Sequence, residues 1–253
     1  MSEPMHEGGE VQASYTLGQK IENFWYHYKW HTLITLFIVL VVTVCTLQMC
    51  GKESYDVYIM YAGDREISQL SEDGSDPPFV QMKETLLPYV SDRDENGEAT
   101  LELNTLYILT PAEIEAENER RRAEAQANGT QAEELNAAAI MENRSIFQSD
   151  VRYSDYYICI LSESLYKSSR TSADGTPLYA SLADYVTDAD VAFYADDAVL
   201  LHTTALADSP VFRDLPEDTV ICLRALSDVS AKKARNREVF AAAEESLRAM
   251  LAP

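Results

Sequence analysis

The most specific chemical pattern in the chain is a short run of oxygen-bearing side chains, residues 92–98 (DRDENGE). Oxygen ligands at alternate positions, with glycine at the sixth for a sharp turn, are typical of the first half of a calcium-binding loop. The sequence therefore predicts a calcium site with ligands from Asp92, Asp94, Asn96 and Glu98.

The second half of the calcium pattern is missing. Its twelfth position holds a bidentate glutamate, whereas this chain has Leu103 there and Glu102 one place early. Aspartate, asparagine and glycine also form plain turns, because asparagine and glycine tolerate positive φ angles. A turn without metal is therefore the alternative, and a calcium ion would bind in the millimolar range and stabilise the loop.

Motifs for catalysis are scarce. Ser164 and Lys167 match the S-x-x-K pattern of penicillin-binding serine enzymes, but the companion S-D-N and K-T-G elements are absent. Asp196 and Asp197 form an acidic pair, and His202 is the one histidine beyond the first 31 residues, most simply a satisfied core residue. No phosphate loop, nucleophile elbow, H-E-x-x-H or C-x-x-C motif occurs. The sequence predicts a protein that is not an enzyme, with a serine-type hydrolase as the alternative.

Two of the four cysteines, Cys159 and Cys222, lie in apolar runs that read as strands. A buried free thiol behaves as a small hydrophobic side chain. A disulfide between the two would need neighbouring strands with matching geometry, which sequence does not establish. We expect structural thiols.

An apolar stretch, residues 30–49, determines where these side chains are positioned in the cell. It contains no Asp, Glu, Lys or Arg, and twenty helical residues span about 30 Å, the hydrocarbon thickness of a bilayer. The sequence predicts contact with the lipid bilayer through this stretch. Aromatic and basic side chains just upstream are expected at the membrane interface: Trp25, Tyr26, Tyr28, Lys29 and Trp30.

The apolar stretch has three other interpretations: a cleaved signal, a lipoprotein signal ending at Cys50, or a buried core helix. The preceding segment is long and acidic, bulky Met49 precedes Cys50, and the stretch lacks a polar stripe. We therefore predict an uncleaved signal anchor. Flanking positive charges are nearly balanced, and we expect a single-pass protein of the cell membrane with its C-terminal domain outside the cytoplasm.

Charge excludes one class of partner. The chain has a net charge of −22, and residues 53–253 hold 17 Lys and Arg against 38 Asp and Glu, a net −21. Such a surface repels phosphate backbones, so we expect no nucleic acid partner.

Three segments are predicted: a disordered tail over 1–13, a juxtamembrane and transmembrane helix over 14–51, and an α/β domain over 53–253. Strands expected near 55–61, 101–109, 155–161 and 219–225 alternate with helices, and an Asp-rich turn joins two further strands around 191–204. This pattern predicts an α/β sandwich with a mostly parallel sheet and one hairpin. Residues 111–129 form a polar helical insertion that we expect to contribute nothing to a core.

The stretch NFWYHYKWHT before the apolar segment resembles that of uncharacterised single-pass membrane proteins of clostridia-like Firmicutes. The domain resembles one lobe of an extracellular solute-binding protein, through residues 155–166, 177–178 and 182–185. The resemblance implies binding rather than catalysis. The sequence thus predicts a membrane-anchored binding or docking domain for a protein or small-molecule partner, with a calcium-stabilised component of an envelope complex as a further alternative.

Overall fold

The computed structural model of the chain describes residues 17–50, 54–71, 74–172 and 174–252. It divides into two compact units with the boundary between Ser54 and Tyr55. The predicted disordered tail over 1–13 lies outside the described residues.

The first unit contains a single long helix, α1 (Leu17–Cys50). Its segment Tyr28–Thr46 is long and apolar enough to cross a membrane, and none of it is buried within the protein. The hydroxyl groups of Thr43 and Thr46 donate to the carbonyl oxygens of Val39 and Val42, so their polar atoms are satisfied inside the helix. This internal pairing is what an apolar surrounding demands.

The predicted interface residues lie on the first half of α1, and all five are exposed. Tyr28 stacks on Phe24, with ring centroids 5.2 Å apart, and meets the edge of His31 at 6.1 Å. The aromatic belt is therefore a continuous part of the helix that carries the apolar segment.

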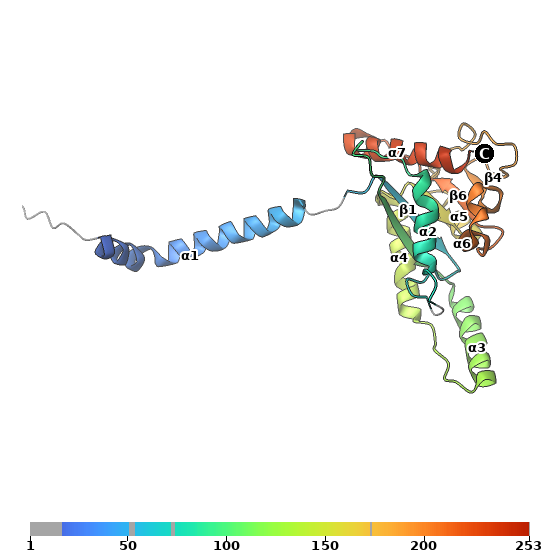
Figure 1. The fold of residues 1–253 in the computed structure, drawn as a ribbon, viewed down its shortest axis with the longest axis horizontal. Coiled ribbons are helices and arrows are strands. Elements are labelled where there is room, and N and C mark those ends of the chain that lie inside the picture. The colour runs from blue at the N-terminus through green and yellow to red at the C-terminus, as the bar shows by residue number, and fades with distance from the viewer. Residues whose placement is uncertain (1–16, 51–53, 72–73, 173, 253) are drawn as a thin grey trace, which may run out of the picture. The chain divides into compact units, whose positions relative to one another are not determined.

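The second unit is built from short strands and helices in a single α/β arrangement (Figure 1). The strands are β1 (Val57–Gly63), β2 (Leu101–Tyr107), β3 (Ile158–Leu161), β4 (Phe193–Ala195), β5 (Ala198–Leu200) and β6 (Val220–Leu223). The α-helices are α2 (Pro78–Leu86), α3 (Pro111–Asn128), α4 (Ala137–Tyr153), α5 (Glu163–Ser169), α6 (Pro210–Arg213) and α7 (Ala234–Met250). Single 3-10 turns are η1 (Leu87–Tyr89), η2 (Leu201–Thr203), η3 (Ala205–Asp208) and η4 (Ser230–Lys232).

All six strands form one sheet in the order β2-β1-β3-β6-β5-β4. β1 pairs in parallel with both β2 and β3. β6 is antiparallel to β3 and to β5, and β4 and β5 form the predicted hairpin. The α/β class is confirmed, but the expectation of a mostly parallel sheet is wrong, because three of these five strand pairs are antiparallel.

The physical reason for the mixed sheet is the length of the connections. A parallel pair needs a crossover of a dozen or more residues, usually with a helix, whereas antiparallel strands can be joined by a tight turn. Between β1, β2 and β3 the chain supplies α2, α3 and α4 as crossovers. Between β3 and β6 the helices α5 and α6 are short, and the two-residue turn Asp196-Asp197 reverses the chain between β4 and β5.

Both faces of the sheet are covered, because β1 and β3 are buried along nearly their whole length. On one face Ile59 and Tyr61 pack with Met82 of α2 and with Leu247 of α7. On the other face Met60 and Ala62 of β1 pack with side chains of α4 and α5, namely Phe147, Val151, Leu165 and Tyr166. The second unit is therefore a three-layer sandwich.

The polar insertion is the helix α3, which extends away from the sheet (Figure 1). Thr110 and Glu113 form a capping box at its start, and Gly129 ends it in the left-handed conformation with φ 67°. The expectation that it contributes nothing to a core is wrong. Ile114 is buried in a small cluster with Leu109 and with Ile140 of α4. One apolar residue suffices because α4 comes back to meet it.

Candidate functional site

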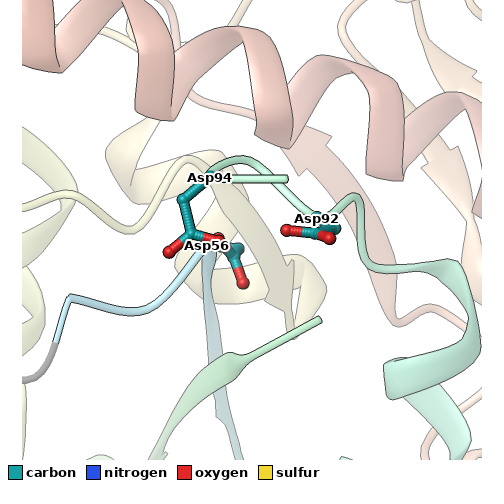
Figure 2. A group of neighbouring side chains, drawn as sticks. All are labelled: Asp56, Asp92 and Asp94. Atoms are coloured by element: carbon teal, nitrogen blue, oxygen red, sulfur yellow. The ribbon is translucent and has the colours of Figure 1, made fainter. Parts of the chain in front are cut away.

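The predicted calcium loop lies between η1 and β2, where it brings Asp92 and Asp94 together with a third aspartate, Asp56 (Figure 2). One carboxylate oxygen from each of the three lies within 4.8 Å of the others. Asp56 directly precedes β1, and Asp92 and Asp94 lie on the loop beside it.

The loop is closed by its own side chains. The carboxylate of Asp92 accepts hydrogen bonds from the backbone N–H groups of Asn96 (3.3 Å) and Gly97 (2.8 Å), and Asp94 accepts from Asn96 at 3.2 Å. The side-chain oxygen of Asn96 accepts from the N–H of Glu98 at 2.8 Å. Gly97 has φ 91°, a conformation that side chains rarely adopt, which explains the glycine at this position.

Asp56 is the member of the group that sequence reasoning missed. It is 1% exposed. Its Oδ2 accepts from the N–H and hydroxyl groups of Thr100 at 2.8 and 2.7 Å, and its Oδ1 accepts from the N–H of Arg93 at 3.2 Å. The sequence does contain a signal that could have identified Asp56, namely a single carboxylate within an otherwise apolar strand segment, YDVYIMY. A buried charge must be paired or hydrogen bonded, so Asp56 had to meet donors from elsewhere.

The three carboxylates are hard oxygen donors of the type that calcium prefers. Asp56 supplies a third carboxylate from outside the loop, whereas the twelfth position of the calcium pattern, Leu103, supplies none. Glu98 is outside the group, and the oxygens that converge also accept backbone hydrogen bonds. Calcium binding here stays a prediction, and the hydrogen bonds account for the loop without an ion.

A second candidate is an open groove of about 540 Å³ at the edge of the sheet where β1 and β2 end. In parallel sheets this carboxyl edge is where ligands bind. Since β6 is antiparallel, the segment before it lies at the same edge and closes one wall. The lining side chains come from that segment, from the residues after β1, from β2 and from α3: Asp64, Arg65, Glu66, Tyr107, Glu117, Arg120, Arg121, Asp214, Leu215, Pro216 and Glu217.

Ion pairs tie the walls of the groove together. Arg121 of α3 contacts Glu117 at 3.0 Å and Glu66, just after β1, at 3.8 Å. Arg65 contacts Asp214 at 3.5 Å on the opposite wall. The hydrogen bond from Arg120 lowers the pKa of Glu117 to about 2, so this carboxylate is ionised throughout the physiological range.

In contrast to Glu117, one carboxylate in the groove has a raised pKa. Burial raises the pKa of Asp64, and the negative charges of Asp218 and Glu113 raise it further. The groove as a whole carries five carboxylates against three guanidinium groups. It is therefore a polar surface with a net negative charge and charged groups of both signs.

His202 contacts the backbone of one wall of the groove. A ring nitrogen of this side chain, Nε2, lies 2.9 Å from the carbonyl oxygen of Leu215 and 3.1 Å from that of Pro216. These two residues belong to the groove wall. The predicted role of His202 as a satisfied structural residue agrees with these contacts, because the ring fixes the segment that leads into β6.

The Ser164 and Lys167 pair does not have the geometry of an activated serine. Lys167 Nζ contacts Glu163 at 2.9 Å, and this carboxylate raises the pKa of the ammonium group. A lysine that activates serine needs a lowered pKa. Ser164 Oγ instead lies 3.3 Å from Ser162 Oγ.

The acidic pair at the hairpin turn is divided between two roles. Asp197 is buried and accepts hydrogen bonds from Tyr166 Oη at 2.5 Å and from Arg170 Nε at 3.1 Å, which holds the turn to α5. Asp196 is exposed, and its backbone carbonyl accepts from the N–H of Leu182. The two carboxylates therefore do not form one site.

Comparison of the chain with protein-family models, with curated proteins and with solved structures found no match. The resemblance to single-pass Firmicutes proteins and to a lobe of solute-binding proteins therefore stays a prediction from the sequence.

Proposed function

We propose that this protein is a membrane-anchored docking domain, held at the outer side of the cell membrane by α1, which binds a charged segment of a partner protein in the carboxyl-edge groove without catalysing a reaction. The observation that carries the proposal is the apolar stretch Tyr28–Thr46, none of which is buried within the protein. The exposed apolar side chains of this stretch favour a lipid surrounding, because water would solvate them at a large cost in free energy.

The groove supports docking of a polar partner. A volume of about 540 Å³ is within the range of ligand sites, but most such sites are apolar, and this one is lined by paired charges. A partner with a net positive surface is favoured by the charge of −21 on residues 53–253. Charges of both signs in the walls fix the orientation of the bound segment.

The hydrolase alternative has less support. It needs a serine beside a basic group, and Lys167 is instead an exposed ammonium ion paired with Glu163. The acidic alternative needs two facing carboxylates, and Asp197 is committed to Tyr166 and Arg170. Neither set offers a proton acceptor next to a nucleophile.

Anchoring and location are tested on washed membranes and on intact cells. We expect the full chain to remain in the membrane pellet after extraction with alkaline carbonate, and we expect protease added to intact cells, after removal of any wall, to digest the C-terminal domain. Release by carbonate would refute the anchor. Protection from protease until the membrane is broken would place the domain in the cytoplasm.

Docking is tested with a photo-crosslinking side chain at Glu217 in the groove, and with the same group at Lys232 as the control. Lys232 is exposed in η4, which precedes α7 near the opposite edge of the sheet. We expect a discrete adduct from position 217 that weakens in high salt and in an Asp64→Lys variant, because both reduce electrostatic attraction. Adducts of equal yield from both positions, or none from the groove, would contradict the proposal.

A further inference from the structure

Cys159 and Cys222 lie directly opposite each other on adjacent antiparallel strands, β3 and β6. Both side chains belong to the same apolar cluster, on the face of the sheet covered by α4 and α5. They therefore point in the same direction from neighbouring strands. The first condition that sequence could not test, that the two cysteines lie on neighbouring strands in register, is met, and the structure holds both as free thiols.

The hydrogen-bond pattern gives the distance between the two backbones. The N–H of Arg224 donates to the carbonyl of Tyr157 at 2.7 Å, and these two residues are opposite each other in the same register. Hydrogen-bonded pairs alternate along an antiparallel ladder, so the Cys159 and Cys222 pair, two residues further, is of the same type. Such pairs have Cα atoms about 5.5 Å apart, within the range of about 4.4–6.8 Å that a disulfide spans, and their Cβ atoms, also about 5.5 Å apart, must come about 1 Å closer as the bond forms.

We propose that Cys159 and Cys222 form a disulfide bond that joins β3 to β6 when the domain folds in an oxidising compartment. The compartment rests on the proposed function, which has the domain outside the cytoplasm, whereas the pairing itself depends only on the sheet. The bond would link the parallel strands β1, β2 and β3 to the antiparallel strands β4, β5 and β6.

The bond has to form before the sheet is fully packed. Both thiols are 0% exposed, and Cys222 Sγ lies 3.5 Å from the carbonyl oxygen of Cys159. Burial holds the pKa of the Cys222 thiol high, so little reactive thiolate exists in the folded domain. Oxidation therefore accompanies folding, while both thiols are still accessible.

The oxidant is a small organic disulfide, or a protein disulfide of the same chemistry. A cysteine thiolate attacks one sulfur of the organic disulfide, which gives a mixed disulfide and releases one thiol. The second cysteine loses its proton and attacks the protein sulfur, which expels the second small thiol. The two cysteines lose two electrons and two protons, and the organic disulfide gains both as two thiols.

The experiment uses the full chain in detergent, with Cys45→Ser and Cys50→Ser so that only the proposed pair remains. The protein is unfolded in urea, refolded with a mixture of oxidised and reduced glutathione, quenched in acid, denatured and labelled with a maleimide polymer. Denaturation before labelling ensures that burial alone cannot protect a thiol. We expect a monomer with no label, and two labels after dithiothreitol.

A melting experiment gives a second measure. The oxidised form should melt about 5–10 °C above the reduced form, because the bond restricts the unfolded chain. Cys159→Ala in the same background should show no response to glutathione. Two labelled thiols in protein that has refolded, or bonds only between separate chains, would overturn the proposal.

The same labelling on intact cells separates this inference from the proposed function. A pair that oxidises when purified but stays reduced in cells, in a domain that added protease cannot reach, refutes the location and leaves the pairing supported. A pair that stays reduced both when purified and in cells, in a domain that protease reaches, overturns the pairing alone.

Discussion

Aspartates with the same functional group have different roles in this domain, and their surroundings explain why. Asp56 is buried and accepts three hydrogen bonds from Arg93 and Thr100, whereas Asp94 is exposed and accepts one from Asn96. A buried donor that loses its acceptor retains the full cost of its desolvation, but an exposed donor is rehydrated. The two positions should therefore respond very differently to the same substitution.

Asp56→Ala should lower the free energy of unfolding by about 2–4 kcal/mol, because the N–H and hydroxyl groups of Thr100 lose their acceptor. Asp94→Ala should change it by no more than about 0.5 kcal/mol. Urea unfolding of the full chain in detergent, followed by circular dichroism, measures both. Equal losses at the two positions would contradict this account of the loop.

The same variants test the predicted calcium site. Calcium that binds only the folded loop must raise the melting temperature, and a millimolar site requires millimolar CaCl2 to do so. The rise should disappear with EDTA and in Asp94→Ala, which keeps the fold. A melting temperature that does not change with calcium would leave the aspartates as turn formers.

At the scale of elements, local sequence patterns predicted which segments form strands and helices, but they did not predict how the strands pair. The strands and the hairpin could be found from alternation and turn residues. The terminal helix α7 also has a regular spacing, with Ala243, Leu247 and Met250 buried along one side. The direction of β6 could not be predicted from local patterns, because its pairing with β3 depends on residues about sixty positions apart in the chain. The groove was missed for the same reason, since its charged side chains come from three segments that are far apart in the chain.

The helix α3 shows how a polar sequence becomes an ordered element. Glu117 accepts from Arg120 Nη2 at 2.6 Å and from Arg121 Nε at 3.0 Å, on one side of the helix. Asn118, which is buried, accepts from the N–H of Leu135 at 2.8 Å. Charge pairs along the surface and one buried amide therefore replace the usual apolar stripe.

These contacts predict a dependence on pH. Because the pKa of Glu117 is lower in the folded domain than its ordinary value of 4.5, its ionised form stabilises the fold above that pH. The contribution is lost as the pH falls from about 4.5 towards about 2. Glu117→Gln should therefore lower the urea midpoint at pH 7, by a small amount because solvent screens the pair, and change it less at pH 2.5.

The matched control for this measurement is Glu119→Gln, which removes the same charge from an exposed position of the same helix. Its effect on the midpoint should be smaller at pH 7 than that of Glu117→Gln. A difference between wild type and Glu117→Gln that grows as the pH falls would refute the assignment.

At the scale of the whole molecule, α1 carries the segment that is long and apolar enough to cross a membrane, and its proposed role as an anchor can be tested by substitution. The centre of its apolar segment is Phe37, which is 67% exposed. Each arginine placed at the centre of a membrane helix costs about 3 kcal/mol on insertion scales. One such charge can be tolerated by a segment this apolar, but two on neighbouring turns should not be.

The double variant Phe37→Arg with Val41→Arg should therefore lose most of its resistance to alkaline carbonate, whereas Phe37→Leu with Val41→Leu should keep it. The fraction of protein in the membrane pellet is the measurement. If the arginine variant stays fully in the pellet while the domain remains folded, α1 is not held by lipid.

The packing of α7 on β1 has a consequence for how the chain is made. Ile59 and Tyr61 of β1 pack in one apolar cluster with Leu247 and Met250 of α7, which follow about 190 residues later in the chain. The apolar side of β1 is therefore fully shielded only after the last turn of α7 has been synthesised and has packed on the sheet. A nascent chain made only as far as β6 would therefore leave this surface of β1 open to other apolar partners, so chaperones should bind it until α7 has been added.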